Sequence, residues 1–263
     1  MEQKSFTEGG RAFILWGATL IDRAHRGQNA DADGLISLLT PVIKGFLTDK
    51  GFDMTVQAQQ VYGGHGYIEE WGMSQFARDA RIAMIYEGAN GVQALDLVGR
   101  KLAQNGGRAL MAFLGELDAY IAEREGKDGI AEFVSGLKIA RGHLQEATDW
   151  LMNNALENFD HAGAVSTDYL RLFGHVSLGY MWAQMAEAAQ AKVAAGDSDG
   201  YYKTKLATGR YFVARTLPET AFYVEADYSA QICSDVMSGA LDIGDYEQGR
   251  PRIPGQTATG ESR

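Results

Sequence analysis

One glutamate, Glu87, stands between Tyr86 and Gly88 and is the residue best suited by type and setting to acid–base chemistry. A carboxylate becomes a stronger base when a bound substrate expels water from around it. The glycine that follows allows a ligand to lie close to the backbone. A glutamate just before a helix more often interacts with the free N–H groups at the helix start. From these residues alone, the structural role is therefore favoured.

A second group of residues consists of Gln60 and the glycine cluster Gly63-Gly64-His65-Gly66. Glycine lets a backbone approach a phosphate and present its N–H groups. The cluster follows a helical pattern and not a strand, which argues against a dinucleotide-binding phosphate loop. His65 has no His, Asp or Glu partner at metal-binding spacing, so we predict no metal site and a histidine at the surface or an interface.

Between these two groups lies Arg78-Asp79, which we expect to form a structural ion pair that fixes the loop before Glu87. The motifs GGHGY, RDARI and IYEG, at these separations, resemble the C-terminal helical domain of the acyl-CoA dehydrogenases. The chain continues with GVQALDLVGRKL and about 150 further residues of helical pattern, similar to the bacterial long-chain-type members with an extra C-terminal domain. The resemblance covers most of residues 5–245. Family members begin with a helical and a β domain, and this chain begins after both.

The resemblance implies roles for individual residues. Glu87 would be the catalytic base, and Tyr86 and Gly88 would contact the thioester, although Tyr86 is equally well explained as a packing aromatic. The implied FAD contacts are Gln60, Gly63, Gly64, Ala89, Gly91 and Gln93. Ala89 stands where a threonine is usual and Gly91 where a glutamine is common, so only backbone donors are expected from these two.

The implied reaction is α,β-dehydrogenation of an acyl-CoA thioester to the trans-2-enoyl-CoA, with FAD accepting a hydride. The implied partners are an acyl-CoA substrate, an electron-transfer flavoprotein, and either a sister copy or an N-terminal dehydrogenase half. We expect a homo-oligomer whose assembly is coupled to cofactor binding, because the glycine cluster would contact FAD bound mainly by a neighbouring subunit. Residues 6–62 are expected to associate, since their helix faces, which would pack on the missing domains or on a sister subunit, would otherwise be exposed. The alternative is a non-catalytic helical association module without a flavin site of its own.

The composition restricts the class of protein. The 263 residues are 46% hydrophobic and 22% charged, as in ordinary globular proteins. The 34 acidic and 24 basic residues give a net charge of -10 with no dense basic cluster, which argues against nucleic-acid binding. Cys233 is the single cysteine, so an intrachain disulfide and a CxxC metal site are excluded. No apolar run approaches the roughly 20 residues of a membrane span, and no signal peptide is recognisable. We expect a cytoplasmic protein.

Helical periodicity and the lack of alternating β-branched runs predict an all-α fold of two helical bundles. The first domain is expected over residues 1–103. Pro41 should either kink its second helix or precede a new helix capped by Thr40, and Asn90 should cap its last helix. The expected helices of this domain cover residues 6–26, 35–46, 52–62, 74–85 and 90–102.

The second domain is expected over residues 104–245, beginning at Gln104-Asn105-Gly106-Gly107. Four long helices should form an antiparallel bundle there, and a short helix should follow. The four long helices are expected at 108–124, 130–159, 167–195 and 202–230, and the short one at 232–241. Residues 246–263 are rich in Pro, Gly and polar side chains and should be disordered.

Overall fold

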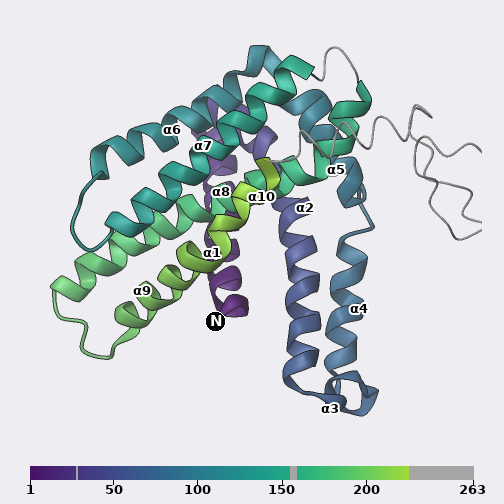
Figure 1. Cartoon of the computed structure of the whole chain (residues 1–263), viewed down its shortest axis with the longest axis vertical. Helices are drawn as coiled ribbons and strands as arrows, with labels where there is room; N and C mark the ends of the chain where they lie inside the picture. The colour runs from purple at the N-terminus through teal and green to yellow at the C-terminus, as the bar shows by residue number, and fades with distance from the viewer. Residues whose placement is uncertain (28, 155–158, 225–263) are drawn as a thin grey trace, which may run out of the picture.

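The computed structural model describes residues 1–27, 29–154 and 159–224, and these residues form helices with no strand among them (Figure 1). The all-α prediction is therefore confirmed. The predicted helix at 232–241 and the predicted disordered tail at 246–263 lie outside the described residues. Among the residues described, no helix is both long enough and apolar enough to cross a membrane.

The helices differ in length from about one turn to ten turns. The α-helices are α1 (Glu2–Gly27), α2 (Ala30–Val61), α3 (Gly64–Tyr67), α4 (Met73–Ala83), α5 (Asn90–Asp96), α6 (Arg108–Arg124), α7 (Ala131–Asn154), α8 (Phe159–Ala194), α9 (Tyr201–Tyr211) and α10 (Thr220–Val224). Short 3-10 or π segments are η1 (Glu69–Trp71), η2 (Leu97–Lys101), η3 (Gln104–Gly107), η4 (Phe212–Thr216) and η5 (Leu217–Glu219).

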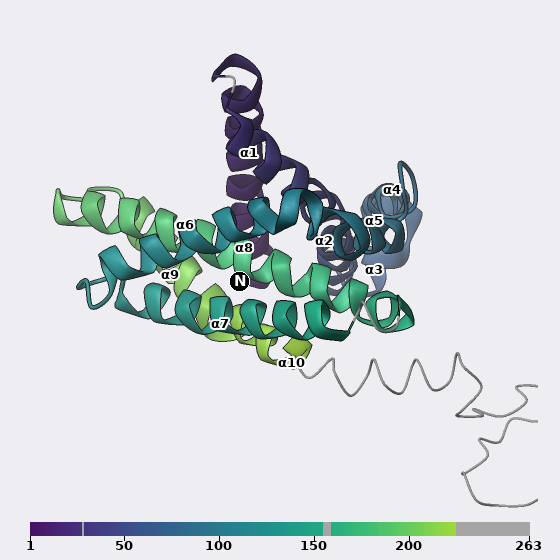
Figure 2. The same cartoon turned by 90° about the horizontal axis from the view of Figure 1, so that it is seen from above.

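Helix α8 is the centre of the fold, because it packs against α1, α2, α5, α7 and α9 (Figure 2). Every residue from 172 to 183 is buried, as expected of a helix that is covered on all sides. Two polar side chains in this run bond within the helix: Ser177 donates to the carbonyl of Phe173, and Nδ1 of His175 lies 2.9 Å from the carbonyl of Arg171.

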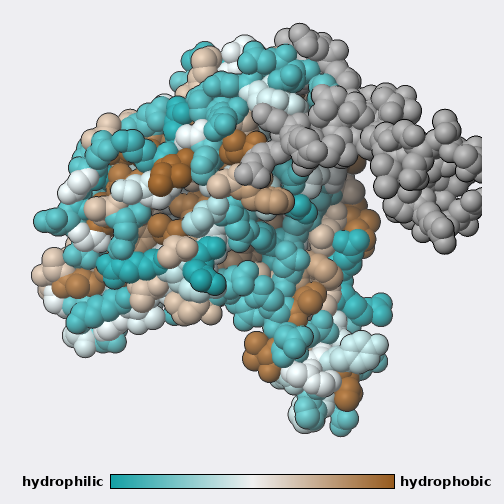
Figure 3. All heavy atoms as spheres, viewed as in Figure 1, coloured by the Kyte–Doolittle hydropathy of each residue, from teal (hydrophilic) through white to brown (hydrophobic). Residues whose placement is uncertain are grey.

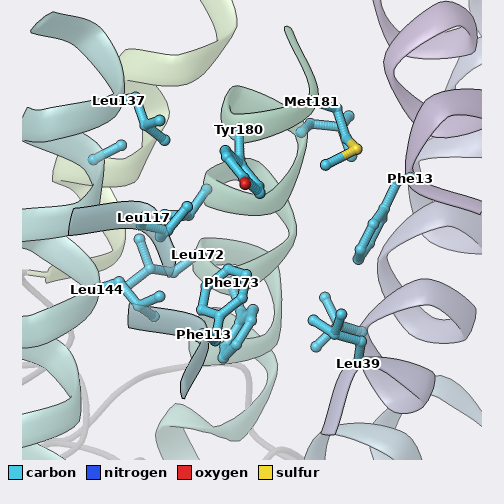
Figure 4. Close-up of a cluster of buried hydrophobic side chains, with 14 of the residues drawn as sticks. Phe13, Leu39, Phe113, Leu117, Leu137, Leu144, Leu172, Phe173, Tyr180 and Met181 are labelled. Carbon is cyan, nitrogen blue, oxygen red and sulfur yellow. The ribbon is translucent and has the colours of Figure 1, made fainter. Parts of the chain in front are cut away.

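The hydrophobic core is continuous across the predicted boundary at residues 104–107. Figure 4 shows Phe13 of α1 and Leu39 of α2 on one side of α8, with side chains of α6 and α7 on the other. Phe113 of α6 stacks on Phe173 of α8 with the ring centres 4.8 Å apart. The division of the chain into two domains stays a prediction.

Helices α2 and α8 cross in close contact where both carry glycine. A Cβ on Gly174 would lie 2.2 Å from the Phe46 ring, and a Cβ on Gly45 would lie 2.9 Å from the Leu170 side chain. Neither position accommodates a larger side chain without displacing its neighbour. The crossing fixes the middle of α2 against the centre of the protein.

Helix α2 runs on past Pro41, so the predicted division into separate helices at 35–46 and 52–62 was wrong. Pro41 supplies no N–H for the carbonyl of Ser37. The hydroxyl of Thr40 donates backwards to the carbonyl of Ile36 over 2.7 Å and does not cap a new helix. Burial of Pro41 and Val42 in the core stabilises the helix across the missing bond.

The predictions for the second half of the chain are partly confirmed. Helix α6 has the predicted bounds, and α7 follows its prediction up to Asn154. Helix α8 begins at Phe159, well before the predicted start at residue 167. The predicted single helix at 202–230 is wrong over its described part: α9 ends at Tyr211, and η4 and η5 precede α10. Pro218 lies at the start of η5 and cannot donate the N–H of a continuous helix.

The second half of α2, with α3, η1 and α4, forms a two-helix arm that extends away from the other helices (Figure 1). We refer to residues 50–83 as the arm. Helix α4 has no buried residue, although it packs along α2. Two helices cannot cover each other fully, so apolar side chains of the arm remain exposed to solvent (Figure 3).

Candidate active site

The loop of residues 84–89, which joins α4 to α5, carries the predicted catalytic base. Glu87 is exposed and has a φ of 51°, in the left-handed region that residues other than glycine seldom adopt. Gly88 follows with a φ of 85°. A left-handed residue that is not glycine costs about 1–3 kcal/mol and persists only where its surroundings hold it. The contacts that hold Glu87 in this conformation are therefore of interest.

Within the described part of the chain, the N–H groups of Glu87 and Gly88 have no acceptor. Backbone hydrogen bonds close the loop at its two ends, from the N–H of Tyr86 to the carbonyl of Ile82 and from the N–H of Asn90 to the carbonyl of Met84. Between these bonds, no acceptor among the described residues takes the N–H of Glu87 or Gly88. Two adjacent unpaired N–H groups beside a carboxylate can polarise a carbonyl oxygen.

Asn90 does not cap α5, so that prediction was wrong. Ala89 occupies the cap position without a side-chain bond. The amide nitrogen of Asn90 instead faces α2, 3.1 Å from the carbonyl of Gly45, 2.9 Å from the hydroxyl of Thr48 and 2.5 Å from Oδ1 of Asp49. The Asn90 side chain therefore bonds α2 and not the N–H groups at the start of α5.

Lys44 is a site residue that the sequence analysis missed. Its ammonium donates to the carbonyl of Gly88 and to Oδ1 of Asn90, each over 2.7 Å. Burial lowers the pKa of Lys44, while the carboxylates of Asp49 and Glu87 act in the opposite direction. The available signal was a lysine flanked on α2 by the apolar residues Val42 and Phe46, which are buried.

The other residues predicted near Glu87 are also in this region. The amide of Gln93 lies 3.3 Å from the carbonyl of Glu87 and 3.4 Å from that of Gly88, so it supports the loop from the α5 side. Tyr86 is 51% exposed and is not a core aromatic. Gly91 is exposed, and a Cβ placed there would meet nothing within 4 Å.

The second predicted group lies at the far end of the arm. Gln60, Gly63 and Gly64 are exposed, and a Cβ on either glycine would meet no atom within 4 Å. Gln60 lies 16 residues beyond Lys44 on α2, or about 24 Å along the helix axis. The two groups cannot line one small pocket. They can contact separate parts of an elongated ligand, or two copies of it.

These exposed surfaces fit FAD as one side of a binding site. The open backbone at Gly63 and Gly64 leaves room for a phosphate group, and the N–H groups of Glu87 and Gly88, which bond no described residue, can donate to a ligand beside Glu87. Residues Ala89 and Gly91 offer backbone only, and the Gln93 amide is already engaged by the loop.

Two neighbouring predictions have different outcomes. Among the described residues no ion pair joins Arg78 to Asp79, so that expectation was wrong. Gln75 donates instead to Asp79 over 2.6 Å, because it lies one helical turn away while consecutive residues diverge around α4. His65 is exposed at the arm tip and packs edge-on against Trp71, with the ring centres 4.9 Å apart.

The chain matches two family models. The model described as "Acyl-CoA dehydrogenase, C-terminal domain" matches residues 15–103, and the one described as "Acetyl-CoA dehydrogenase C-terminal like" matches residues 113–228. The first contains the loop of Glu87 and both groups of predicted contacts. The second contains most of α6–α10.

Curated relatives are dehydrogenases of acyl-CoA compounds. The 3-methylmercaptopropionyl-CoA dehydrogenase of Ruegeria pomeroyi is 34% identical over 224 residues, which is 83% of this chain and 38% of that protein. The broad-specificity linear acyl-CoA dehydrogenase FadE5 of Mycobacterium tuberculosis is 27% identical over 232 residues, with the same two shares. The chain thus spans well under half the length of these relatives.

A solved structure has the same fold. The crystal structure of Caenorhabditis elegans ACDH-11 in complex with C11-CoA matches 81% of this chain and 35% of that one, with a TM-score of 0.67 and 19% sequence identity. The helical arrangement described above is therefore that of a known structure. The two family models and the 34% identical relative establish that the chain belongs to the acyl-CoA dehydrogenase family and contains its C-terminal helical domains.

Proposed function

We propose that this chain is the base-bearing part of an FAD-dependent acyl-CoA dehydrogenase, with Glu87 as the catalytic base. The reaction would convert an acyl-CoA thioester to the trans-2-enoyl-CoA. The observation that supports this most is the conformation of the loop: Glu87 is exposed and left-handed and is not the helix cap, and the N–H groups of Glu87 and Gly88 have no acceptor among the described residues. A glutamate in a purely structural role would instead bond the N–H groups in the first turn of α5.

The chain's own residues would act on the α carbon and the thioester carbonyl. The Glu87 carboxylate would accept the α proton, and the electron pair of that C–H bond would form the new double bond as a hydride leaves the β carbon. FAD, when bound, would supply the acceptor for that hydride. The N–H groups of Glu87 and Gly88 would donate to the carbonyl oxygen and stabilise its developing negative charge. Tyr86 and Gly88 would line the thioester.

Two sets of residues would contact FAD. Gln60 and the exposed backbone at Gly63 and Gly64 would contact one end of an FAD molecule, or one of two FAD molecules. Ala89, Gly91 and Gln93 would contact another part. Because both sets lie on open surface, the remaining contacts would come from an N-terminal dehydrogenase segment or a sister subunit. We propose a homo-oligomer in which electrons pass on to an electron-transfer flavoprotein.

The test replaces Glu87 in a complemented enzyme, made by fusion or co-expression with the N-terminal part of a relative. Glu87→Gln preserves size but removes the base, so flavin reduction by an acyl-CoA should slow by about 10²–10⁴-fold. Glu87→Asp should give an intermediate rate because the carboxylate is withdrawn by one methylene. Thioester binding should persist, since the backbone donors are unchanged.

Glu70→Gln is the matched control, because Glu70 is also an exposed glutamate but belongs to η1 of the arm and not to the loop of Glu87. It should reduce the flavin at the parent rate. If Glu87→Gln retains the parent rate, the base is another carboxylate and the proposal fails.

A second candidate is a non-catalytic association module, favoured by α4, which buries none of its own residues. The absorbance of the purified complemented protein separates the two. A flavin spectrum retained through gel filtration supports the enzyme. A stable but colourless complex supports the module.

A further inference from the structure

We propose that Lys44 is a positioning residue, whose ammonium holds the loop that carries Glu87 in its reactive conformation. This inference rests on the proposed function of Glu87. Lys44 lies 43 residues earlier in the chain, on α2, and its ammonium bonds the carbonyl of Gly88 and the side chain of Asn90. Its role would be exerted through the main chain of the loop.

The contacts of Lys44 converge with those of Gln93 on one oxygen atom. The ammonium of Lys44 donates to the carbonyl of Gly88 over 2.7 Å, and the amide of Gln93 approaches the same oxygen at 3.4 Å from α5. The second bond of Lys44 reaches Asn90, which is itself bound to three acceptors on α2. The loop is thus held to α2 immediately after Glu87.

The loop has little else to define its conformation at this point. The N–H groups of Glu87 and Gly88 are unpaired within the described residues, so no backbone hydrogen bond restrains them. Glu87 also has an unfavourable φ of 51°. Side-chain donors from outside the loop are what maintain such a conformation. A bond from a charged donor is the strongest of these.

The segment of α2 that carries Lys44 is closely packed against the core. Gly45, the next residue, lies against Leu170 of α8, and Phe46 fills the space above Gly174. These close contacts leave α2 little freedom to shift or rotate at this crossing. A donor fixed to the core of the protein can define the position of a loop more precisely than a donor on the arm.

The first test measures hydrogen exchange in the 263-residue chain without any flavin or substrate. Lys44→Met keeps the length of the side chain but removes its donors. The amide of Asn90, which closes the loop onto Met84, should exchange about tenfold faster or more, because a bond to a charged group is lost. Amides of α6 and α8 should exchange at the parent rate.

Lys101→Met is the matched control. Lys101 is also partly buried and donates to the same helix, to Ser37 over 2.5 Å, but it does not contact the loop. It should leave the exchange of the Asn90 amide unchanged. Equal protection of that amide in Lys44→Met and the parent would overturn the proposal.

The second test uses the complemented enzyme. Lys44→Met should lower kcat by about tenfold or more, and by a larger factor than it raises KM for the acyl-CoA, because the loop that carries both the base and the carbonyl donors is displaced from its reactive position. Lys101→Met should retain the parent kcat. Lys44→Cys should share the loss, and alkylation with 2-bromoethylamine should restore most of kcat by rebuilding an ammonium of nearly the same length.

The parent treated with 2-bromoethylamine controls for alkylation of Cys233. Failure of the alkylated Lys44→Cys protein to regain activity, with parent activity unharmed, would overturn the proposal. So would a parent-like kcat in Lys44→Met when Glu87→Gln is inactive, and in that case the role of Glu87 would stand. A parent-like kcat in both Lys44→Met and Glu87→Gln would overturn the proposed function as well. The exchange experiment would then test separately whether Lys44 holds the loop.

Discussion

The indole nitrogen of Trp182 donates a hydrogen bond to the main-chain oxygen of Ser5 over 3.1 Å, across 177 positions of the chain. Both residues are almost completely buried. Gly9 lies one turn further along α1, where a Cβ would be 2.8 Å from the same indole nitrogen. The first helix of the chain therefore packs on α8 through a surface that only glycine leaves open.

This contact predicts that Gly9→Ala destabilises the protein by about 1–3 kcal/mol, because the added methyl group must displace the Trp182 ring. Gly142→Ala is the control: it is exposed in the middle of α7, and its Cβ would meet nothing within 4 Å. There the change should stabilise by about 0.5–1 kcal/mol, the usual gain of alanine over glycine in a helix. Urea unfolding followed by circular dichroism measures both. Equal effects of the two substitutions would show that α1 does not pack as described.

Glu219 gives a prediction for acid pH. Its carboxylate lies 3.3 Å from Nε2 of His175 and 3.4 Å from the ammonium of Lys50. Nε2 of His175 lies within reach of this carboxylate but makes no well-aligned hydrogen bond with it. The interaction with His175, followed by that with Lys50, lowers the pKa of Glu219 below its usual 4.5 against the opposing effect of burial.

Because the folded pKa is lower than the unfolded one, the unfolded chain binds more protons between the two values. The stabilisation by Glu219 is thus fully present above about pH 4.5 and is lost as the pH falls through the lower, folded value. Glu219→Gln should be less stable than the parent at pH 6, and the difference should shrink as the pH is lowered towards 3. Urea midpoints measured across this range test the claim. A difference that stays constant with pH would contradict it.

Periodicity predicted the helices that are amphipathic over their whole length. The bounds of α6 were predicted because Gly107 precedes it in a left-handed conformation and its buried residues recur regularly. The boundaries that failed depend on tertiary contacts. Helix α2 continues through Pro41 because buried neighbours hold it there, and no local pattern reveals that burial in advance.

In the candidate site too, the residues with a local sequence signal were predicted and those defined by tertiary contacts were not. Glu87, Gly88 and the glycine cluster could be selected from their motifs, because glycine and an isolated carboxylate are recognisable in sequence. Lys44 was not selected: its apolar neighbours in the sequence indicate burial but not a partner, since Gly88 lies 44 positions away and their contact exists only after α2 and the loop pack together. The same is true of Asn90: its sequence position is that of a cap, but acceptors on α2 are within its reach.

We predict that the 263-residue chain alone binds FAD weakly or not at all. Gly63 and Gly64 are open to solvent, and the loop of Glu87 lies about 24 Å away along α2, so these residues form only part of a cofactor site. Titration of FAD should leave its fluorescence nearly unchanged. Micromolar or tighter binding by the homogeneous chain would contradict this prediction.

The last prediction concerns the exposed apolar side chains of the arm and of α1. Phe76 of α4 is 61% exposed and Leu15 of α1 is 65% exposed, and Figure 3 shows hydrophobic side chains at the surface of the arm. Apolar surface of this kind is commonly covered by another subunit. Light scattering of the purified chain should therefore give a mass that is a multiple of 28.6 kDa.

Phe76→Glu and Leu15→Glu show which surface is used, because a charge buried at an interface disfavours association. A shift to the monomer in Phe76→Glu alone would place the interface on α4, and a shift in Leu15→Glu alone would place it on α1, within the predicted residues 6–62. Arg78→Glu, on the exposed surface of α4 but with no apolar side chain removed, is the control and should keep the parent mass. A parent chain that remains a monomer at high concentration would contradict the proposed self-association.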